Sequence, residues 1–345
     1  MSNPPKFSVI IPLYNKRSYI RRAVDSVLSQ ALTDFELIVV DDGSTDGSVE
    51  ELNKLIHDSR LRLIKQCNQG VGAARNTGIH NALANWIAFI DADDMWLTNH
   101  LCELKELVDR FPESGLVSTR HKMNSTNDDV VLKILRPGNI RRIDYFKEAS
   151  KNIGIVCSST AAVRRDVVSV VGGFKAFRAG EDLEFWARIA LSYPVAISDK
   201  LTCIYFRGTG GTMEAIEIEQ SLINAEVVCM RLRDISPSVS MLCDRAEQDI
   251  NLWLNSSIRG YVNSRLLGGT PGAIYRGEIE SARSAFKLAM HPLGARYTFY
   301  RLTLLLPDSL LTKTALAYRL VKWFQFRSRL LQPRFAKRII GMFKQ

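Results

Sequence analysis

Three aspartates follow a short apolar stretch in the first third of the chain. Residues 86–90 read Trp-Ile-Ala-Phe-Ile, and Asp91, Asp93 and Asp94 come directly after them. Such a run, stopping at turn-type residues, is typical of a buried parallel strand, and ligands of open α/β sheets bind outside the carboxyl ends of such strands. Clustered carboxylates repel one another unless a cation joins them, and Mg²⁺ or Mn²⁺ would bridge them to substrate phosphates. The alternative is a solvated acidic turn that caps the next helix.

A second candidate is Arg75, which lies one turn into an expected helix. The helix opens at Gly70-Val71-Gly72, so its first backbone N–H groups would be accessible to a ligand. A helix N-terminus is a natural phosphate site, and an arginine fork adds paired donors. The segment therefore predicts contact with a phosphate, against the alternative of an ordinary exposed arginine.

The elements that must position these residues alternate between strand and helix. Apolar runs predict strands at Phe7–Leu13, Phe35–Val40 and Leu61–Lys65, and helical spacing predicts helices at Ser18–Gln30, at Glu50–His57 and from 72 to 84. This alternation favours βαβ units and a mostly parallel sheet flanked by helices, an α/β fold. Beyond Gly115 we expect strands at Leu116–Arg120, Val130–Leu135, Ile155–Val163, Val195–Ser198 and Leu201–Phe206, and helices at Arg142–Ser150 and 181–192.

The chain is expected to hold two regions. From Glu214 onward the pattern is helical only, so we place a boundary near 213, between a domain at 1–213 and a helical region at 214–345. With 345 residues, of which 46% are hydrophobic and 24% charged, a sizeable core is expected.

Six scattered cysteines without a CxxC pair fit a reduced cytosol better than a zinc site or a disulfide framework. We find neither a targeting signal nor an apolar run of ~18 residues, and expect a cytoplasmic protein.

Five ordered motifs carry a resemblance to a known family. The segments SVIIPLYN, VVDDGSTDGS, NQGVGAARNTGI, FIDADD and GEDLEFWAR resemble those of the family 2 glycosyltransferases of the GT-A fold. The resemblance covers about residues 6–212. It implies a Rossmann-like GT-A domain that transfers a sugar from a nucleotide sugar, UDP- or GDP-linked, to a hydroxyl acceptor with inversion and with Mg²⁺ or Mn²⁺.

The resemblance also implies roles for residues of the donor half. It places Pro12, Tyr14 and Asn15 at the nucleoside, and gives Asp42 the hydrogen bond to the base, since a carboxylate accepts from the N–H of uracil or guanine. Asp41 and Asp46 are expected to serve in local turns or caps instead. Arg75 belongs to the same group, as a ligand of the donor phosphates.

The remaining roles concern the metal, the sugar and the acceptor. The resemblance assigns Asp91 to the ribose and donor sugar and Asp93 to the metal, with Asp94 nearby. One member of the pair Glu181-Asp182 is expected to act as general base, and we choose Asp182, with Glu181 supporting the acceptor. Arg207 and the glycines after it resemble a loop that closes on the diphosphate. Trp186 fits either the core or an acceptor platform.

Two other functions fit parts of the pattern. A nucleotidyltransferase also places acids at strand ends to bind metal and phosphates, but it releases pyrophosphate. A catalytically silent nucleotide-sugar-binding scaffold would keep the fold, although all the expected acids are present. The resemblance favours an enzyme of cell-surface polysaccharide, lipopolysaccharide or glycolipid synthesis, acting on a glycan or lipid-linked acceptor.

The positive charge is concentrated at the C-terminal end. From Arg301 onward ten lysines and arginines accompany one acid, Asp308, so this tail carries +9 of the net +10. Leu316, Leu320, Trp323, Phe324 and Leu331 fall on one face of an expected amphipathic helix. A basic aromatic helix can lie in a membrane interface, and each cation near an anionic surface adds about 1 kcal/mol. We expect peripheral binding to the inner face of the plasma membrane and no nucleic-acid binding; the alternative is that the helix packs on the catalytic domain.

Overall fold

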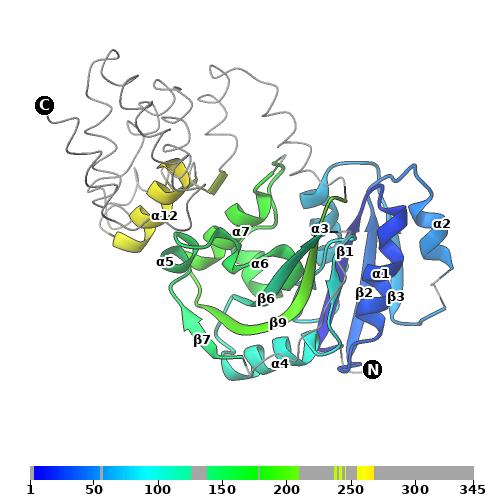
Figure 1. Ribbon diagram of the computed structural model, residues 1–345, viewed down its shortest axis with the longest axis horizontal. Helices are drawn as coiled ribbons and strands as arrows, with labels where there is room; N and C mark the ends of the chain where they lie inside the picture. The colour runs from blue at the N-terminus through cyan, green and yellow to red at the C-terminus, as the bar shows by residue number, and fades with distance from the viewer. Residues whose placement is uncertain are drawn as a thin grey trace, which may run out of the picture. The chain divides into compact units, whose positions relative to one another are not determined.

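A computed structural model describes residues 4–54, 57–125, 138–177, 179–209, 237–238, 241–242, 245 and 255–267 (Figure 1). The chain divides into two compact units, one formed by Met1–Leu222 with Ile235–Tyr261 and the other by Ile223–Asp234 with Val262–Gln345. All residues of the site described below belong to the first unit. The expected boundary near 213 stays a prediction.

The described residues form one mixed sheet of nine strands: β1 (Phe7–Leu13), β2 (Phe35–Asp41), β3 (Leu61–Lys65), β4 (Trp86–Phe89), β5 (Met95–Trp96), β6 (Leu116–Ser125), β7 (Ile140–Ile143), β8 (Ala161–Arg164) and β9 (Val195–Arg207). Their order is β3-β2-β1-β4-β8-β6-β9-β5, with β7 paired to β9. The first four strands of this order are parallel to one another, as predicted, and β6 is parallel to β9. β5, β7 and β8 pair antiparallel with their neighbours.

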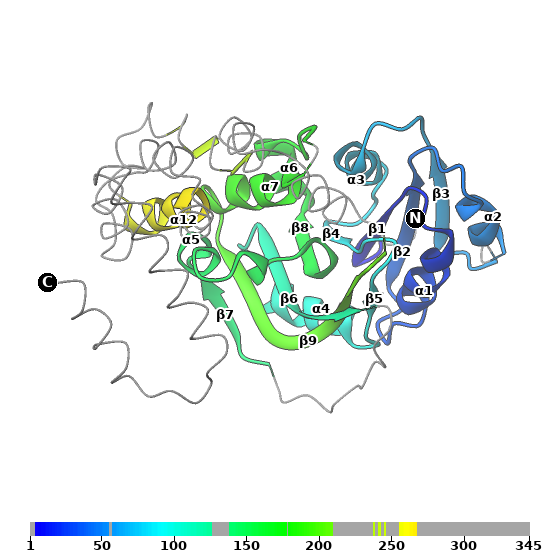
Figure 2. The same ribbon diagram turned by 45° about the horizontal axis from the view of Figure 1, so that its top comes forward.

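Helices cover both faces of the sheet (Figure 2). The described residues contain the helices α1 (Arg17–Leu28), α2 (Ser48–Asn53), α3 (Val71–His80), α4 (His100–Arg110), α5 (Tyr145–Ala149), α6 (Arg165–Val171), α7 (Glu181–Ala190) and α12 (Ser256–Leu267). Alternate residues of β1 and β2 pack with the apolar stripes of α1 and α4 in one core, and Figure 2 shows α3, α6 and α7 on the opposite face. All seven residues of β1 and of β2 are buried, which explains their continuous apolar sequences.

Close packing on the second face depends on small and aromatic residues. A Cβ on Gly78 of α3 would lie 2.6 Å from Cγ2 of Ile10 in β1, so the glycine lets the helix approach the sheet. Phe89 of β4 packs edge-on against Phe174 and lies 6.2 Å from Trp186 of α7, centroid to centroid. These contacts seat α7, whose first turn carries the acidic pair, on the strand that leads into the three aspartates.

The structure corrects several expected elements. A helix was expected at Arg142–Ser150, but residues 142–143 belong to β7 and only the short α5 follows, because Asp144 ends the strand and accepts a hydrogen bond from the backbone N–H of Lys147. A strand was expected at Ile155–Val163. The chain instead forms two 3-10 turns, η1 (Ile153–Ile155) and η2 (Ser158–Thr160), and only then the short strand β8. The two strands expected at 195–206 are one continuous strand, β9. The strand expected at Val130–Leu135, the basic tail and most of the helical region expected at 214–345 lie outside the described residues.

Two further sequence expectations concern membranes and cysteines. In the described part of the chain, no helix is long and apolar enough to cross a membrane. The four cysteines described there, Cys67, Cys102, Cys157 and Cys203, are free thiols.

Candidate active site

Three parallel strands bring the predicted donor residues to one edge of the sheet. The register aligns Leu13 of β1 with Asp41 of β2 and Ile10 of β1 with Phe89 of β4, so the carboxyl ends of the three strands lie side by side. The turns that leave these ends carry Tyr14 and Asn15, Asp42, and the aspartates 91–94. This is the edge at which open α/β sheets bind ligands.

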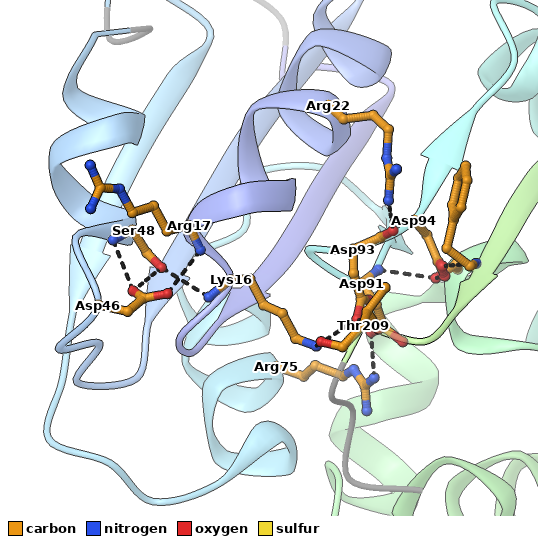
Figure 3. Close-up of polar contacts among 12 residues, drawn as sticks. Lys16, Arg17, Arg22, Asp46, Ser48, Arg75, Asp91, Asp93, Asp94 and Thr209 are labelled. Carbon is orange, nitrogen blue, oxygen red and sulfur yellow. Dashed lines mark hydrogen bonds and ion pairs between the residues drawn. The ribbon is translucent and has the colours of Figure 1, made fainter. Parts of the chain in front are cut away.

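The three aspartates after β4 differ in their surroundings (Figure 3). The backbone N–H of Asp94 donates to the carbonyl of Asp91, at 3.0 Å, which closes a tight turn. The Asp94 side chain points inward and accepts hydrogen bonds from the Ser159 hydroxyl and from the backbone N–H of Phe206. Burial and the charges of Asp91 and Asp93 raise the pKa of Asp94 well above its usual value. Asp94 therefore anchors the turn, while Asp91 and Asp93 face the open edge.

Arg75 connects the aspartate turn to the acidic pair of α7. Its guanidinium is buried; Nη2 lies 2.8 Å from Oδ1 of Asp91 and Nη1 lies 2.7 Å from Oε1 of Glu181. The guanidinium also lies 5.3 Å from the ring centroid of Phe174. In this arrangement Arg75 joins the aspartate turn after β4 to the first turn of α7, and its expected contact with phosphate stays a prediction.

The charges of Arg75, Asp91 and Glu181 shift one another's pKa values. Burial alone would lower the pKa of Arg75, but the carboxylates of Asp91, Glu181 and Asp182 raise it, so the arginine stays charged. Burial also raises the pKa of Asp91, which Arg75 opposes and Asp93 reinforces. Burial and the neighbouring Asp182 raise the pKa of Glu181, and Arg75 again opposes the shift. Removing the arginine would leave two poorly solvated carboxylates facing each other.

Asp182 is more accessible than its neighbour in the acidic pair. Gly180 takes a left-handed conformation, with φ of 77°, and turns the chain into α7 so that both acids occupy the first helical turn. Asp182 accepts hydrogen bonds from the Ser158 hydroxyl, at 3.2 Å, and from the backbone N–H of Leu183, at 2.8 Å. Glu181 is buried and held by Arg75. Of the pair, Asp182 is therefore better placed to take a proton.

Asp93 meets a lysine that the sequence analysis did not single out. The ammonium nitrogen of Lys16 lies 2.7 Å from Oδ2 of Asp93, and the Thr209 hydroxyl donates to the same oxygen, also at 2.7 Å. Lys16 directly follows the Tyr14-Asn15 motif, and this adjacency was the one sequence signal that could have identified it. Figure 3 shows its side chain reaching from the end of β1 to the aspartate turn.

On the nucleoside side, the expected residues surround the ends of β1 and β2. Pro12 is buried inside β1, whereas the Tyr14 ring is 48% exposed and free to stack on a ligand. Asn15 has a positive φ of 50°, and its side-chain oxygen accepts from the N–H of Thr45 at 2.8 Å. These contacts fix the turn that presents Tyr14.

Asp42 is buried and its oxygens already accept three hydrogen bonds. The donors are the side-chain amide of Gln66 and the backbone N–H groups of Gln69 and Gly70, at 2.7 to 2.9 Å. Asp42 thus holds the loop that leads into α3, and its expected contact with a base stays a prediction. Asp41 accepts from the N–H of Ser44, which confirms its turn role.

Other residues singled out in the sequence have structural roles. Asp46 accepts hydrogen bonds from the Ser48 N–H at the start of α2 and from the Arg17 N–H at the start of α1, as expected for a turn or cap residue. Trp186 is fully buried among aromatic rings and belongs to the core. Arg207 is exposed and is the last residue of β9. Of the glycine loop expected at 208–212, residues 210–212 lie outside the described residues.

The acidic edge fits a cation that arrives with a phosphate ligand. In the described part of the chain, no group of three or more His, Cys, Asp and Glu side chains is arranged to hold a metal ion. Mg²⁺ commonly needs only one or two carboxylates, because waters and substrate phosphates supply the other ligands. Asp91 and Asp93 can provide that number, and Asp94, whose two oxygens are occupied, cannot.

Comparisons with known proteins identify glycosyltransferases that are similar to this chain. Residues 8–172 match the family model for glycosyl transferase family 2. An uncharacterized glycosyltransferase of Nostoc sp. is 40% identical over 121 residues, which are 34% of this chain and 37% of that protein. The succinoglycan biosynthesis protein ExoW of Rhizobium meliloti is 41% identical over 111 residues, 31% of this chain and 35% of ExoW. Glycosyltransferase GlyA of Streptococcus pneumoniae is 41% identical over 151 residues, 44% of this chain and 21% of GlyA.

The matched segments therefore span well under half the length of these relatives. Among solved structures, S. aureus TarS 1-349 in complex with UDP-GlcNAc is similar, with a TM-score of 0.61 and 20% identity, covering 91% of this chain and 88% of that one. This likeness confirms the predicted α/β GT-A fold.

Proposed function

We propose, from the membership of residues 8–172 in glycosyl transferase family 2, that this protein transfers a sugar from a nucleotide sugar to a hydroxyl acceptor. The observation that carries the proposal is the double ion pair of Arg75. It connects Asp91, in the aspartate turn after β4, with Glu181 of the acidic pair on α7. This proximity supports a site in which donor phosphates and a proton acceptor lie at neighbouring positions, as a single displacement requires.

In the proposed donor complex, the nucleoside lies at the ends of β1 and β2. The exposed Tyr14 ring offers a stacking surface, and Asp42 shapes the pocket through the 66–70 loop or contacts the base. Asp93, with Asp91, would hold Mg²⁺ or Mn²⁺ on the diphosphate. When bound, that ion neutralises the charge that grows on the departing nucleoside diphosphate.

Asp182 is the proposed general base. Its carboxylate takes the proton of the acceptor hydroxyl as the hydroxyl oxygen bonds to the sugar C1, and the bond from C1 to the diphosphate breaks. Attack from the face opposite the diphosphate inverts the configuration at C1. Glu181 is less suited to this step because Arg75 binds it and it is buried. A single available base is sufficient for inversion.

The proposed biological setting is cell-surface polysaccharide or glycolipid synthesis at the cytoplasmic face of the membrane. The segmental identity with ExoW, a succinoglycan biosynthesis protein, supports the polysaccharide part of this proposal. The concentration of +9 charge after residue 300 supports a position near anionic lipid, where a lipid-linked acceptor would be found. The acceptor is then a glycan or a lipid-linked sugar.

A ligand screen tests the donor assignment. Thermal unfolding is followed with UDP, GDP, other nucleoside diphosphates and their sugar conjugates, each with and without Mn²⁺; UDP sugars come first because TarS was solved with UDP-GlcNAc. A ligand at 100 times its Kd stabilises the folded protein by about 2.7 kcal/mol, so the correct nucleotide stands out. Asp93→Asn should lose the Mn²⁺-dependent part of the shift.

The matched control is Asp25→Asn, which removes a carboxylate that is 54% exposed on α1. It should keep the full shift, because Asp25 lies outside the site. If no nucleotide or nucleotide sugar raises the unfolding temperature of the parent protein, the donor proposal is wrong.

A further inference from the structure

Lys16 joins two distant parts of the first unit across the donor edge. Its backbone N–H donates to the Ser48 hydroxyl at 2.9 Å, which fixes the start of its side chain at the corner between β1 and α1. Its ammonium group donates to the carbonyl of Thr209 at 3.0 Å and pairs with Asp93 at 2.7 Å. The Lys16 and Asp93 side chains are each 15% exposed, so solvent screens the pair only partly.

The ammonium group occupies one carboxylate oxygen of Asp93, the residue proposed to bind the metal ion. Oδ2 of Asp93 accepts from both Lys16 and Thr209. Two guanidinium groups, those of Arg75 and Arg22, also lie beside the aspartate turn, but both are bound by other partners. Arg75 is bound by two carboxylates, and Arg22 donates to the Asp93 carbonyl and lies over the Phe206 ring. Lys16 is thus the cation that competes with a metal ion for the Asp93 carboxylate.

We propose, as a deepening of the proposed glycosyl transfer on which it rests, that Lys16 is a built-in counter-ion that occupies Asp93 in the donor-free protein and transfers to the donor diphosphate when a metal-bound nucleotide sugar enters. Lys16 then makes metal binding depend on the donor. Lys16 holds the Asp93 side chain in place of a metal ion in the free protein and contacts a phosphate in the donor complex.

Simple electrostatics favours the exchange. An ammonium and a divalent cation on the same carboxylate repel each other across a few ångströms of a partly buried site, so metal binding is weakened while Lys16 stays on Asp93. The diphosphate supplies anionic oxygens at the same edge, and the flexible four-carbon lysine stem lets the ammonium follow them. A metal ion without a nucleotide has to displace Lys16 with no compensation, so its affinity is low.

The test measures Mn²⁺ binding in the absence of any nucleotide, by the loss of the electron paramagnetic resonance signal of free Mn²⁺. Lys16→Met keeps most of the side-chain length and removes the charge. We expect it to bind Mn²⁺ about five- to tenfold more tightly than the parent, the effect of losing one partly screened competing charge. Lys54→Met, which removes a lysine that is 62% exposed on the surface, should bind Mn²⁺ like the parent.

The second measurement repeats the titration with saturating nucleoside diphosphate. Here the advantage of Lys16→Met should vanish or reverse, because the variant lacks the ammonium that contacts the diphosphate. Equal Mn²⁺ affinity of Lys16→Met and the parent without nucleotide, or no detectable Mn²⁺ binding by either, overturns the inference. Neither result bears on nucleotide-sugar binding in the ligand screen, so failure here is distinct from failure of the proposed function. If Lys16→Met does not fold, Lys16→Gln, which also removes the charge, is measured instead and must show the same tightening.

Discussion

Replacing Arg75 by methionine should destabilise the protein strongly and in a pH-dependent way. The arginine side chain is 3% exposed, and it pairs with Glu181, which is 10% exposed, and with Asp91, which is 28% exposed. Methionine fills much of the same volume but leaves both carboxylates without their counter-ion. The perturbation therefore tests whether the bridge holds the two halves of the site together.

The magnitude follows from the burial of the two pairs. Removing one partner of a buried ion pair typically costs about 3–5 kcal/mol, since the remaining charge stays desolvated. Glu181 is buried enough to incur most of that cost, whereas Asp91 is partly hydrated and adds little. We expect a loss of about 4 kcal/mol in the free energy of unfolding at pH 7.5. The double variant Arg75→Met, Glu181→Gln should recover about 1–2 kcal/mol, because it removes the more deeply buried charge.

The sign of the pH dependence is fixed by the carboxyl pKa values. Burial raises the pKa of Asp91 and Glu181 in the folded protein, and Arg75 opposes both shifts. Between the ordinary carboxyl pKa and the raised one, the folded state binds more protons than the unfolded state, so stability falls as pH rises. Loss of Arg75 raises both pKa values further and extends this window toward neutral pH. The destabilisation should therefore be smaller at pH 5 than at pH 7.5.

Urea unfolding at the two pH values measures the effect. The control is Arg141→Met, which breaks an ion pair of the same 2.7 Å length with Asp199 where both side chains are more than a third exposed. That variant should lose at most about 1 kcal/mol, with little pH dependence. A loss below about 1 kcal/mol for Arg75→Met, or an equal loss at pH 5 and pH 7.5, would refute the bridge as the source of stability.

Three further outcomes are expected. Asp182→Asn should leave donor affinity within a few-fold of the parent and lower turnover by about 10²–10⁴, the usual range for a lost general base; a greater loss in Glu181→Gln would reverse the assignment within the pair. Ser158→Ala should lower kcat by roughly tenfold with donor KM unchanged, because its hydroxyl orients Asp182, and Ser158→Thr should restore it; a change in KM alone would contradict this. A chain ending at Leu311 should lose co-sedimentation with anionic liposomes that the full chain shows, and equal partitioning would reject the membrane proposal.

The parallel half of the fold was predictable because its signals are local. Strands such as β1 and β2 are buried on both faces, and so they read as continuous apolar runs in the sequence. The acids that end β4 stand out because charged residues directly follow such a run. The strand prediction was weaker for strands that are only partly buried, such as β7. Helical spacing around 142–150 missed the strand β7, which is defined by its pairing to β9.

The roles of individual site residues were less predictable, because they depend on contacts between distant segments. Arg75 reads as a helix arginine near a phosphate, yet it pairs with Glu181, 106 positions away. Lys16 reads as an ordinary polar residue after a turn, and its partners Asp93 and Thr209 lie in the segments that follow β4 and β9. Asp94 looks like a third metal ligand, but Ser159 and a backbone N–H from β9 draw it inward.

The most direct test of the account is the phosphorus-containing product that the protein makes. The purified protein is incubated with Mg²⁺ and the nucleotide sugar that stabilises it best, and ³¹P NMR follows the phosphates. Glycosyl transfer to an acceptor or to water breaks the bond between C1 and the diphosphate. The parent protein should therefore release the nucleoside diphosphate, and the Asp93→Asn variant should release none. The appearance of nucleoside monophosphate, or of pyrophosphate from a nucleoside triphosphate supplied instead, would contradict it.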